Sequence, residues 1–324
     1  MKYLKEYTIA CEAVFQACAL ASEMQERLES TDCLHKDDLS PVTLVDFCVQ
    51  VLLNLHLSSH FPTDEIMGEE DSSFLRQVEN GWMVGKMVKS LERFFSGIQE
   101  NEILEAIDRG GSQGGPRGRF WVIDPIDGTK GFIRGEQYAV ALALIENGEV
   151  VLGFLGCPKL VIEGREGVLF SAIKRQGVRM HFLEDQKEAP LPKYKSKELE
   201  LIYTEPHESS KSHSHDLAYA IAKQLHAHPK ASRLDSQSKY ALVALNLASI
   251  YLRIPTKIHR IEKIWDHAAG EIIVEEAGGV VTDLFGKKLD YTLGKTLSAN
   301  RGILVTQEID HAKAVEASIH SLKT

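Results

Sequence analysis

Two aspartates three residues apart follow a short apolar run in the middle of the chain. Residues 120–123 are apolar and favour a buried strand, and the carboxylates of Asp124 and Asp127 come next, followed by the hydroxyl of Thr129. Because Pro125 cannot donate a hydrogen bond to a ladder, we expect the strand to end at Asp124. Oxygen ligands of this kind suit a hard divalent cation, above all Mg²⁺. The same residues also fit an Asp-rich turn.

Three further carboxylates are candidates to join this pair. Apolar residues at helical spacing over 269–277, ended by Gly278, predict a helix that starts with Asp266 at its N-cap. The helix dipole would keep that carboxylate ionised, so Asp266 is either a simple cap or a metal ligand. Asp46 and Glu69 each lie next to an apolar run and near a turn, and for both a solvated surface role stays open.

The elements around these residues alternate between helices and strands. We expect a hairpin at the Asn147–Gly148 turn, and short strands from 159 to 183. Helical patterns cover residues 3–28, a segment that ends before His60, the mixed-polar segment 73–108, and 216–227, 238–252 and 307–322. This alternation predicts mixed α/β layers. We place a domain boundary between Cys157 and Pro158, which gives an N-terminal α+β domain, 1–157, and a C-terminal α/β domain, 158–324.

The composition limits the class of protein. The chain has 324 residues, 44% of them hydrophobic and 26% charged, which is the balance of a globular protein. A net charge of -9 argues against nucleic acid as a partner. The 5 cysteines form no C-x-x-C pair and indicate reduced thiols in the cytoplasm. No apolar run is long enough to cross a bilayer and the first residues do not form a signal peptide, so we expect no membrane partner. We also expect a monomer.

Three motifs in order along the chain resemble the inositol monophosphatase superfamily. They are Gly68-Glu69-Glu70, Asp124-Pro-Ile-Asp127-Gly-Thr129 and Trp265-Asp266-His-Ala-Ala-Gly270. The resemblance is closest to the 3′(2′),5′-bisphosphate nucleotidase branch, because of Lys36-Asp-Asp38-Leu-Ser40-Pro41-Val42-Thr43 and of Lys130-Gly131, where inositol monophosphatases usually have Thr-Asn. It implies a layered α-β-α-β-α sandwich with metals between an α+β part and an α/β part.

The resemblance also implies a role for each matching residue. Two or three Mg²⁺ ions would be held by Glu69, Asp124, the carbonyl of Ile126, Asp127 and Asp266. Asp46 and Thr129 would orient and deprotonate the attacking water. The backbone N–H groups of Gly128 and Thr129 would bind the phosphate.

Four residues of the second half match positions that contact the adenosine and its second phosphate: His213, Ser236, Lys239 and Arg253. The spacing around His213 departs from the family pattern, so His215 is an alternative. A zinc site formed by His213-x-His215 and His226-x-His228 is disfavoured, because no cysteine or acidic ligand stands at a fitting spacing. His267 is expected to support its neighbours rather than to act as a base.

The expected activity is that of a Mg²⁺-dependent, lithium-sensitive phosphatase. It would remove the 3′-phosphate of adenosine 3′,5′-bisphosphate (PAP) to give AMP, and would also accept the 2′ isomer and the 3′-phosphorylated sulfate donor (PAPS). One alternative is an inositol polyphosphate 1-phosphatase, for which Lys239 and Arg253 supply little positive charge. Another is a non-catalytic nucleotide-binding protein, which the presence of all the expected metal ligands disfavours.

Overall fold

A mixed seven-stranded sheet forms the centre of the computed structural model, which describes residues 2–28, 32–35, 41–77, 80–192, 194, 202–205, 215–225, 230–255 and 261–323. Its strands follow the chain order: β3 (Glu65–Gly68), β4 (Arg119–Asp127), β5 (Ala139–Glu146), β6 (Glu149–Ile162), β7 (Arg165–Ile173), β8 (Val178–Phe182) and β9 (Glu188–Ala189). Only β3 and β4 are parallel, and each later neighbour is antiparallel. Parallel pairing at the edge brings the C-terminal ends of β3 and β4 together.

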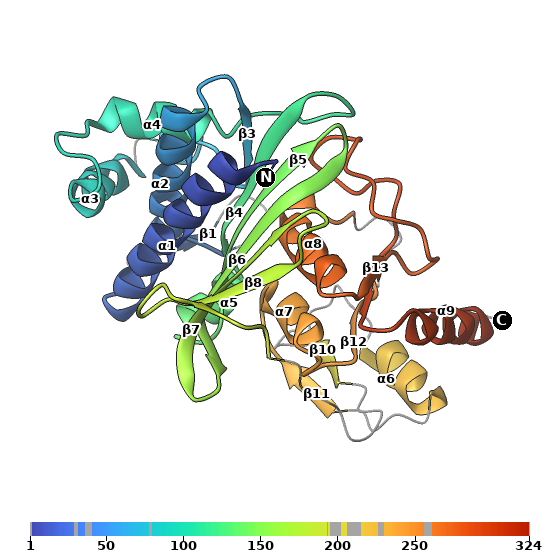
Figure 1. Cartoon of the computed structure of the whole chain (residues 1–324). Coiled ribbons are helices and arrows are strands. Elements are labelled where there is room, and N and C mark those ends of the chain that lie inside the picture. The colour runs from blue at the N-terminus through green and yellow to red at the C-terminus, as the bar shows by residue number, and fades with distance from the viewer. Residues whose placement is uncertain are drawn as a thin grey trace.

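The N-terminal helices cover one face of this sheet (Figure 1). Helices α1 (Leu4–Glu26) and α2 (Leu44–His60) pack on the sheet, and α3 (Gly81–Leu91) and α4 (Glu100–Asp108) pack against α2. The short pair β1 (Cys33–His35) and β2 (Pro41–Thr43) comes before α2. Residues Ala10, Val14, Ala17 and Ala21 recur at helical spacing on α1 and are buried, which confirms the helix predicted at 3–28. Their small side chains let α1 lie close to the sheet.

The opposite face of the sheet is covered by α7 (Ser238–Ala244) and α8 (Ala268–Glu276), as Figure 1 shows. The side chains that β5 turns toward these helices are mainly alanines, and β6 contributes Gly153. A Cβ atom at Gly153 would lie 2.3 Å from Cγ2 of Ile272 and 3.0 Å from the carbonyl oxygen of Ala269. Helix α8 can therefore approach the sheet closely, and its N-terminal end is held near the strand that carries Asp124 and Asp127.

A second, smaller sheet and two outer helices complete the layers. The sheet has the order β12 (Ile250–Arg253), β14 (Ile303–Thr306), β13 (Val280–Thr282), and the parallel pair β10 (Ile202–Glu205) and β11 (Lys230–Arg233) lies nearby. Helices α6 (His215–Gln224) and α9 (Ile309–Lys323) pack on its outer side (Figure 1). The succession of layers is α-β-α-β-α, which confirms the predicted sandwich.

Local predictions were confirmed at the hairpin and wrong in one helix. Strands β5 and β6 meet at Glu146 and Glu149, with Asn147 and Gly148 both at positive φ, as a two-residue hairpin requires. The helix predicted at 238–252 ends at Ala244. The chain then forms β12, because Ile250 to Leu252 fill two separate cores on the two faces of a strand.

The proposed boundary between Cys157 and Pro158 lies inside β6, and the sheet continues as far as β9. The division into two domains stays a prediction.

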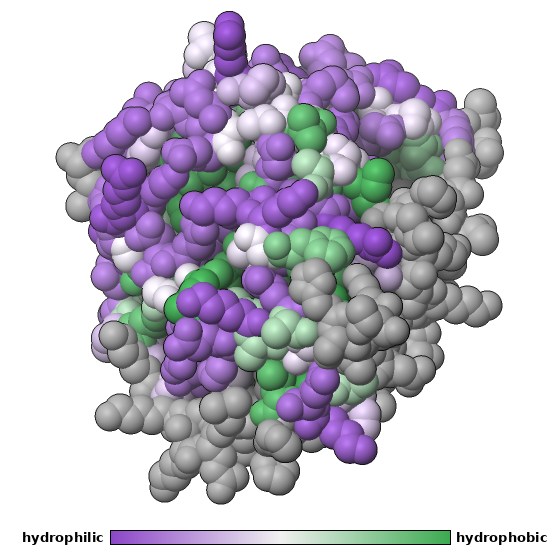
Figure 2. Space-filling model, turned by 90° about the vertical axis from the view of Figure 1, so that its right-hand side faces the viewer, coloured by the Kyte–Doolittle hydropathy of each residue, from purple (hydrophilic) through white to green (hydrophobic). Residues whose placement is uncertain are grey.

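The face drawn in Figure 2 is mainly hydrophilic, with smaller hydrophobic patches between the polar side chains. Within the described part of the chain, no helix is both long and apolar enough to cross a membrane.

Candidate active site

An irregularity in β4 brings Asp124 and Asp127 to the same side of the sheet. Asp124 lies opposite Ala141 of β5, and Asp127 lies opposite Ala139, so the register shifts by one residue between them. In a regular strand, side chains three residues apart point to opposite faces of the sheet. The extra residue of a β-bulge brings the two side chains to the same face. The prediction that the strand ends at Asp124 was wrong: β4 runs through Pro125 to Asp127, because the bulge removes the need for a donor at the proline.

Glu69 reaches the same place from the neighbouring strand. Its backbone N–H donates to the carbonyl of Ile123, 3.2 Å away, directly beside Asp124. The buried amide of Gln50 fixes the next residue by donating to the Glu70 carbonyl and accepting from the Glu70 N–H, at 2.7 and 2.9 Å. Gly68 leaves room for that amide, since a Cβ atom there would lie 2.5 Å from the Gln50 side chain. The Gly-Glu-Glu motif thus sets the backbone that carries Glu69.

Asp124 is surrounded by negative charge. It is 2% exposed, and burial together with the carboxylates of Glu69, Asp127 and Asp266 raises its pKa well above the ordinary value. Its Oδ1 atom has no hydrogen-bond partner among the described residues. A buried carboxylate with an unpaired oxygen and three acidic neighbours fits a divalent cation, which would supply the missing charge and the missing ligand contact.

Asp46 and Thr129 also lie in contact. The Oδ2 atom of Asp46 accepts from the N–H and the hydroxyl of Thr43, at 2.8 and 2.6 Å, and so forms a capping box at the start of α2. Its Oδ1 atom lies 3.5 Å from the hydroxyl of Thr129, which also donates to the carbonyl of Ile126 at 3.1 Å. Asp46 therefore caps a helix and faces the β4 motif with its second oxygen.

The start of α7 touches the same motif from the second half of the chain. Asp127 accepts a 2.5 Å hydrogen bond from the backbone N–H of Gln237. Gly128 has φ 89°, a left-handed conformation that glycine adopts most easily, and begins α5 (Thr129–Ile133). A Cβ atom at Gly128 would lie 2.9 Å from Cβ of Ser236. Gly128 and Ser236, predicted to bind different parts of one ligand, are therefore neighbours.

Two cations, Lys239 and Arg253, act electrostatically on Asp127. Burial raises the pKa of Asp127, whereas Lys239 and Arg253 oppose that rise. Burial lowers the pKa of Lys239 to about 8 although Asp127 works against this, and its ammonium donates to the Leu234 carbonyl at 2.9 Å. Positive charge thus lies close to the acidic group without cancelling the field at Asp124.

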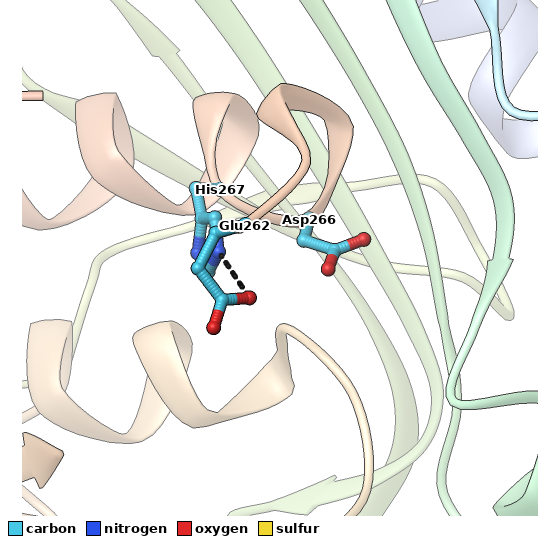
Figure 3. Close-up of side chains that lie close together, drawn as sticks. All are labelled: Glu262, Asp266 and His267. Atoms are coloured by element: carbon cyan, nitrogen blue, oxygen red, sulfur yellow. Dashed lines mark ion pairs between the residues drawn. The ribbon is translucent and has the colours of Figure 1, made fainter. Parts of the chain in front are cut away.

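Asp266 belongs to a second group of charged side chains. Ligand atoms of Glu262, Asp266 and His267 lie within 4.8 Å of one another (Figure 3). Arg253 contacts both carboxylates, with Nε 3.1 Å from Glu262 and Nη2 3.4 Å from Asp266. The prediction that Asp266 is the N-cap of α8 was wrong. Asp266 ends a 3₁₀ turn, η3 (Ile264–Asp266), and His267 is the N-cap, so the Asp266 carboxylate stays available to the site.

His213 lies outside the described residues, as do residues 36–40 and the pair His226 and His228. The residues that the sequence reasoning missed are buried partners of the expected ones, namely Gln50, Gln237 and Glu262. Gln237 directly follows Ser236, and Glu262 stands four residues before Asp266, so proximity in sequence to a predicted site residue was a usable signal for both.

Comparison with solved structures identifies the class of fold. An inositol monophosphatase from Thermotoga maritima aligns with a TM-score of 0.65 at 20% identity, covering 99% of both chains. The layered fold is therefore that of the inositol monophosphatases.

The chain belongs to the inositol monophosphatase family, which it matches over residues 4–321 and whose members are metal-dependent phosphatases. It is 39% identical to a 3′(2′),5′-bisphosphate nucleotidase of Emericella nidulans, over all of both chains. It is also 39% identical to a 3′(2′),5′-bisphosphate nucleotidase of Oryza sativa, over 94% of this chain and 91% of the relative.

Proposed function

We propose that this phosphatase is a 3′(2′),5′-bisphosphate nucleotidase, which hydrolyses the 3′-phosphate of adenosine 3′,5′-bisphosphate and releases AMP. The observation that carries the proposal is the position of Asp127. Asp127 lies on the same strand segment as Asp124, whose pKa it raises, and its own carboxylate feels the positive charges of Lys239 and Arg253. A substrate with two phosphates matches this pairing, since one phosphate would lie at the acidic group with its cations and the other at the basic side chains.

Metal binding is assigned to the carboxylates that gather at β3, β4 and η3. We propose that Glu69, Asp124, the carbonyl of Ile126, Asp127 and Asp266 hold two or three Mg²⁺ ions. When bound, these ions would neutralise the phosphate charge and make water more acidic. The unpaired oxygen of Asp124 and its raised pKa support this assignment.

The protein itself would orient the attacking water and receive its proton. Thr129 and Asp46 are placed for this, because the Thr129 hydroxyl lies 3.5 Å from Oδ1 of Asp46 while Oδ2 of Asp46 is fixed by Thr43. Water would attack the phosphorus as the bond to the ribose oxygen breaks. We assign the backbone N–H groups of Gly128 and Thr129 to the phosphate, and Ser236, Lys239, Arg253 and His213 to the adenosine and second phosphate.

The substrate can be tested directly. Phosphate release is measured from adenosine 3′,5′-bisphosphate, its 2′ isomer, PAPS, AMP, inositol 1,4-bisphosphate and fructose 1,6-bisphosphate, with Mg²⁺ and with or without Li⁺. We expect the adenosine bisphosphates and PAPS to be hydrolysed fastest and Li⁺ to inhibit. Faster turnover of the inositol substrate would instead indicate an inositol polyphosphate 1-phosphatase.

Asp127→Asn tests the site itself, because the amide keeps the shape and removes one metal-binding charge. Activity should fall by roughly 10³-fold, as it does when a group that stabilises the transition state is lost. Glu149→Gln, on the exposed end of β6, is the matched control and should retain normal activity. Near-normal activity of Asp127→Asn would contradict the metal assignment.

We also propose that the protein acts as a monomer in the cytoplasm. None of the five cysteines forms a disulfide, and burial raises the pKa of the Cys11 thiol to about 12, which suits a reducing compartment. The mainly hydrophilic face in Figure 2 supports a monomer.

A further inference from the structure

Arg253 is held by two carboxylates that differ in their surroundings. Its Nε contacts Glu262, whose side chain is 4% exposed, whereas its Nη2 contacts Asp266, whose side chain is 21% exposed. In Figure 3 the Asp266 carboxylate points away from Glu262 and His267. One end of the guanidinium is thus fixed in the interior, and the other is directed toward the group of proposed metal ligands.

Glu262 is itself held by a buried chain of contacts. Nε2 of His267 lies 3.6 Å from Glu262, and Nδ1 of the same ring lies 2.7 Å from the hydroxyl of Tyr240 on α7. Tyr240 is fully buried and packs against Gly270 of α8, where a Cβ atom would lie 2.4 Å from the ring. Glu262 therefore contacts β12 through Arg253 and lies beside the His267 ring, which α7 and α8 hold in place.

The two carboxylates cannot attract the Arg253 guanidinium equally strongly during the proposed reaction. Asp266 is a proposed metal ligand, and a carboxylate that binds a cation has less charge to offer a neighbouring arginine. Glu262 is more deeply buried than Asp266 and is not one of the metal ligands proposed above. A guanidinium held at Nε by one buried carboxylate keeps its plane fixed, which two-point recognition of a phosphate requires.

We infer that Glu262 is a positioning residue, which holds Arg253 for the second phosphate of the substrate and so sets the preference for a bisphosphate. This inference rests on the proposed function, because Arg253 is assigned there to the second phosphate. Glu262 does not touch the substrate and acts only through Arg253.

The test compares two substrates that differ by one phosphate, adenosine 3′,5′-bisphosphate and 3′-AMP. For Glu262→Gln we expect KM for the bisphosphate to rise about tenfold, the effect of weakening one charge-assisted contact, with a much smaller change in kcat. The loss of kcat/KM on 3′-AMP should stay within about threefold. Glu275→Gln, an exposed glutamate of α8, is the control and should leave the ratio between the two substrates unchanged.

A double-mutant cycle shows whether Glu262 acts through Arg253. Arg253→Lys should lower the preference for the bisphosphate, and adding Glu262→Gln to it should cost little more, because the contact is already lost. Additive losses would overturn the inference.

Thermal unfolding of each variant accompanies the kinetics. If Glu262→Gln does not fold, Glu262→Asp replaces it, because aspartate keeps the charge on a shorter side chain. Glu262→Asp should then show a reduced preference for the bisphosphate over 3′-AMP. An unchanged preference overturns the inference.

The two substrates distinguish a failure of the proposed function from a failure of the role inferred for Glu262. If the unmodified enzyme hydrolyses 3′-AMP with the same kcat/KM as the bisphosphate, the proposed function is wrong, and so is the proposed role of Glu262. If the unmodified enzyme prefers the bisphosphate and Arg253→Lys loses that preference while Glu262→Gln keeps it, the proposed function stands and only the inference about Glu262 is overturned.

Discussion

Two groups of buried acidic residues lie close together in this protein, and they balance their charge differently. Around Asp124 the neighbours are carboxylates, and its pKa is raised by burial, Glu69, Asp127 and Asp266. Around Glu262 the charge is met by Arg253 at 3.1 Å, and the ring of His267 lies 3.6 Å away. At Asp124 the main influences from the described residues are burial and other carboxylates, so the first group fits a metal ion. In the second group Arg253 pairs with Glu262, so this group fits a rigid support for the arginine.

The largest effect is expected from removing the carboxylate at the centre of the first group. Asp124→Asn should lower activity by roughly 10³-fold or more, because that side chain faces all three other acidic groups. The metal-free variant should unfold at a higher temperature than the metal-free parent, since one repelling charge is gone. Mg²⁺ should raise the unfolding temperature of the parent and have little effect on the variant. A variant that Mg²⁺ stabilises as strongly as the parent would show that the first group is not a metal site.

Removing the metal should reveal the repulsion in the first group. The pKa values of Asp124, Asp127 and Asp266 are raised in the metal-free fold, first by burial. The folded state therefore binds protons more tightly than the unfolded state at pH values above 3.8, and the metal-free protein loses stability as pH rises through that window.

Mg²⁺ competes with these protons, so it should stabilise the protein more at pH 8 than at pH 4.5, which is nearer the ordinary carboxyl pKa of 3.8. At a hundred times its Kd the gain is about 2.7 kcal/mol. Unfolding in urea at both pH values, with EDTA or with Mg²⁺, measures it. An equal gain at the two pH values would contradict this explanation.

A third buried carboxylate sharpens the comparison, because it is balanced by neither a metal nor an arginine. Glu271 accepts a hydrogen bond from the Tyr291 hydroxyl in the core, and burial, followed by the charge of Glu275, raises its pKa to about 8. Since the folded pKa lies above the ordinary 4.5, the protein loses stability as pH rises from about 4.5 to about 8.

Glu271→Gln removes that dependence. The variant should be more stable than the parent at pH 9, by about 2 kcal/mol, and the difference should shrink or reverse near pH 5. Its stabilisation by Mg²⁺ should equal that of the parent. Urea unfolding at pH 5, 7 and 9 gives the comparison, with Glu105→Gln, an exposed glutamate of α4, as the control. Parallel stability curves for Glu271→Gln and the parent would show that Glu271 stays ionised.

The sequence predicted much of the fold because the signals were local. The spacing of small apolar residues on α1 and the Asn147–Gly148 turn each specify a structure within a few residues. It failed over 238–252, where apolar residues that look helical are divided between α7 and β12 by the cores on either side. Packing from distant parts of the chain outweighed local preference there.

The site was predicted from residue types rather than from its support. The carboxylates stand out in sequence because each follows an apolar run or opens a helix. Gln50, Gln237 and Glu262 do not, since their effect comes only from what they contact. Proximity to a predicted site residue points to Gln237 and Glu262, but their contacts and those of Gln50 are found only when the chain is folded, because a hydrogen bond across 20 or 110 residues leaves no spacing to recognise.

The sequence by itself determined the kind of chemistry and the order of its parts, since the acidic motifs and the elements that carry them are local and could be identified without coordinates. The tertiary structure decided how their charge is shared. The bulge in β4 turns Asp124 and Asp127 to one side, and Gly153 lets α8 bring Asp266 near them. Arg253 then pairs with Glu262. Electrostatic energy depends on distance and burial, so acidic residues that look alike in sequence differ in charge environment once the chain is folded.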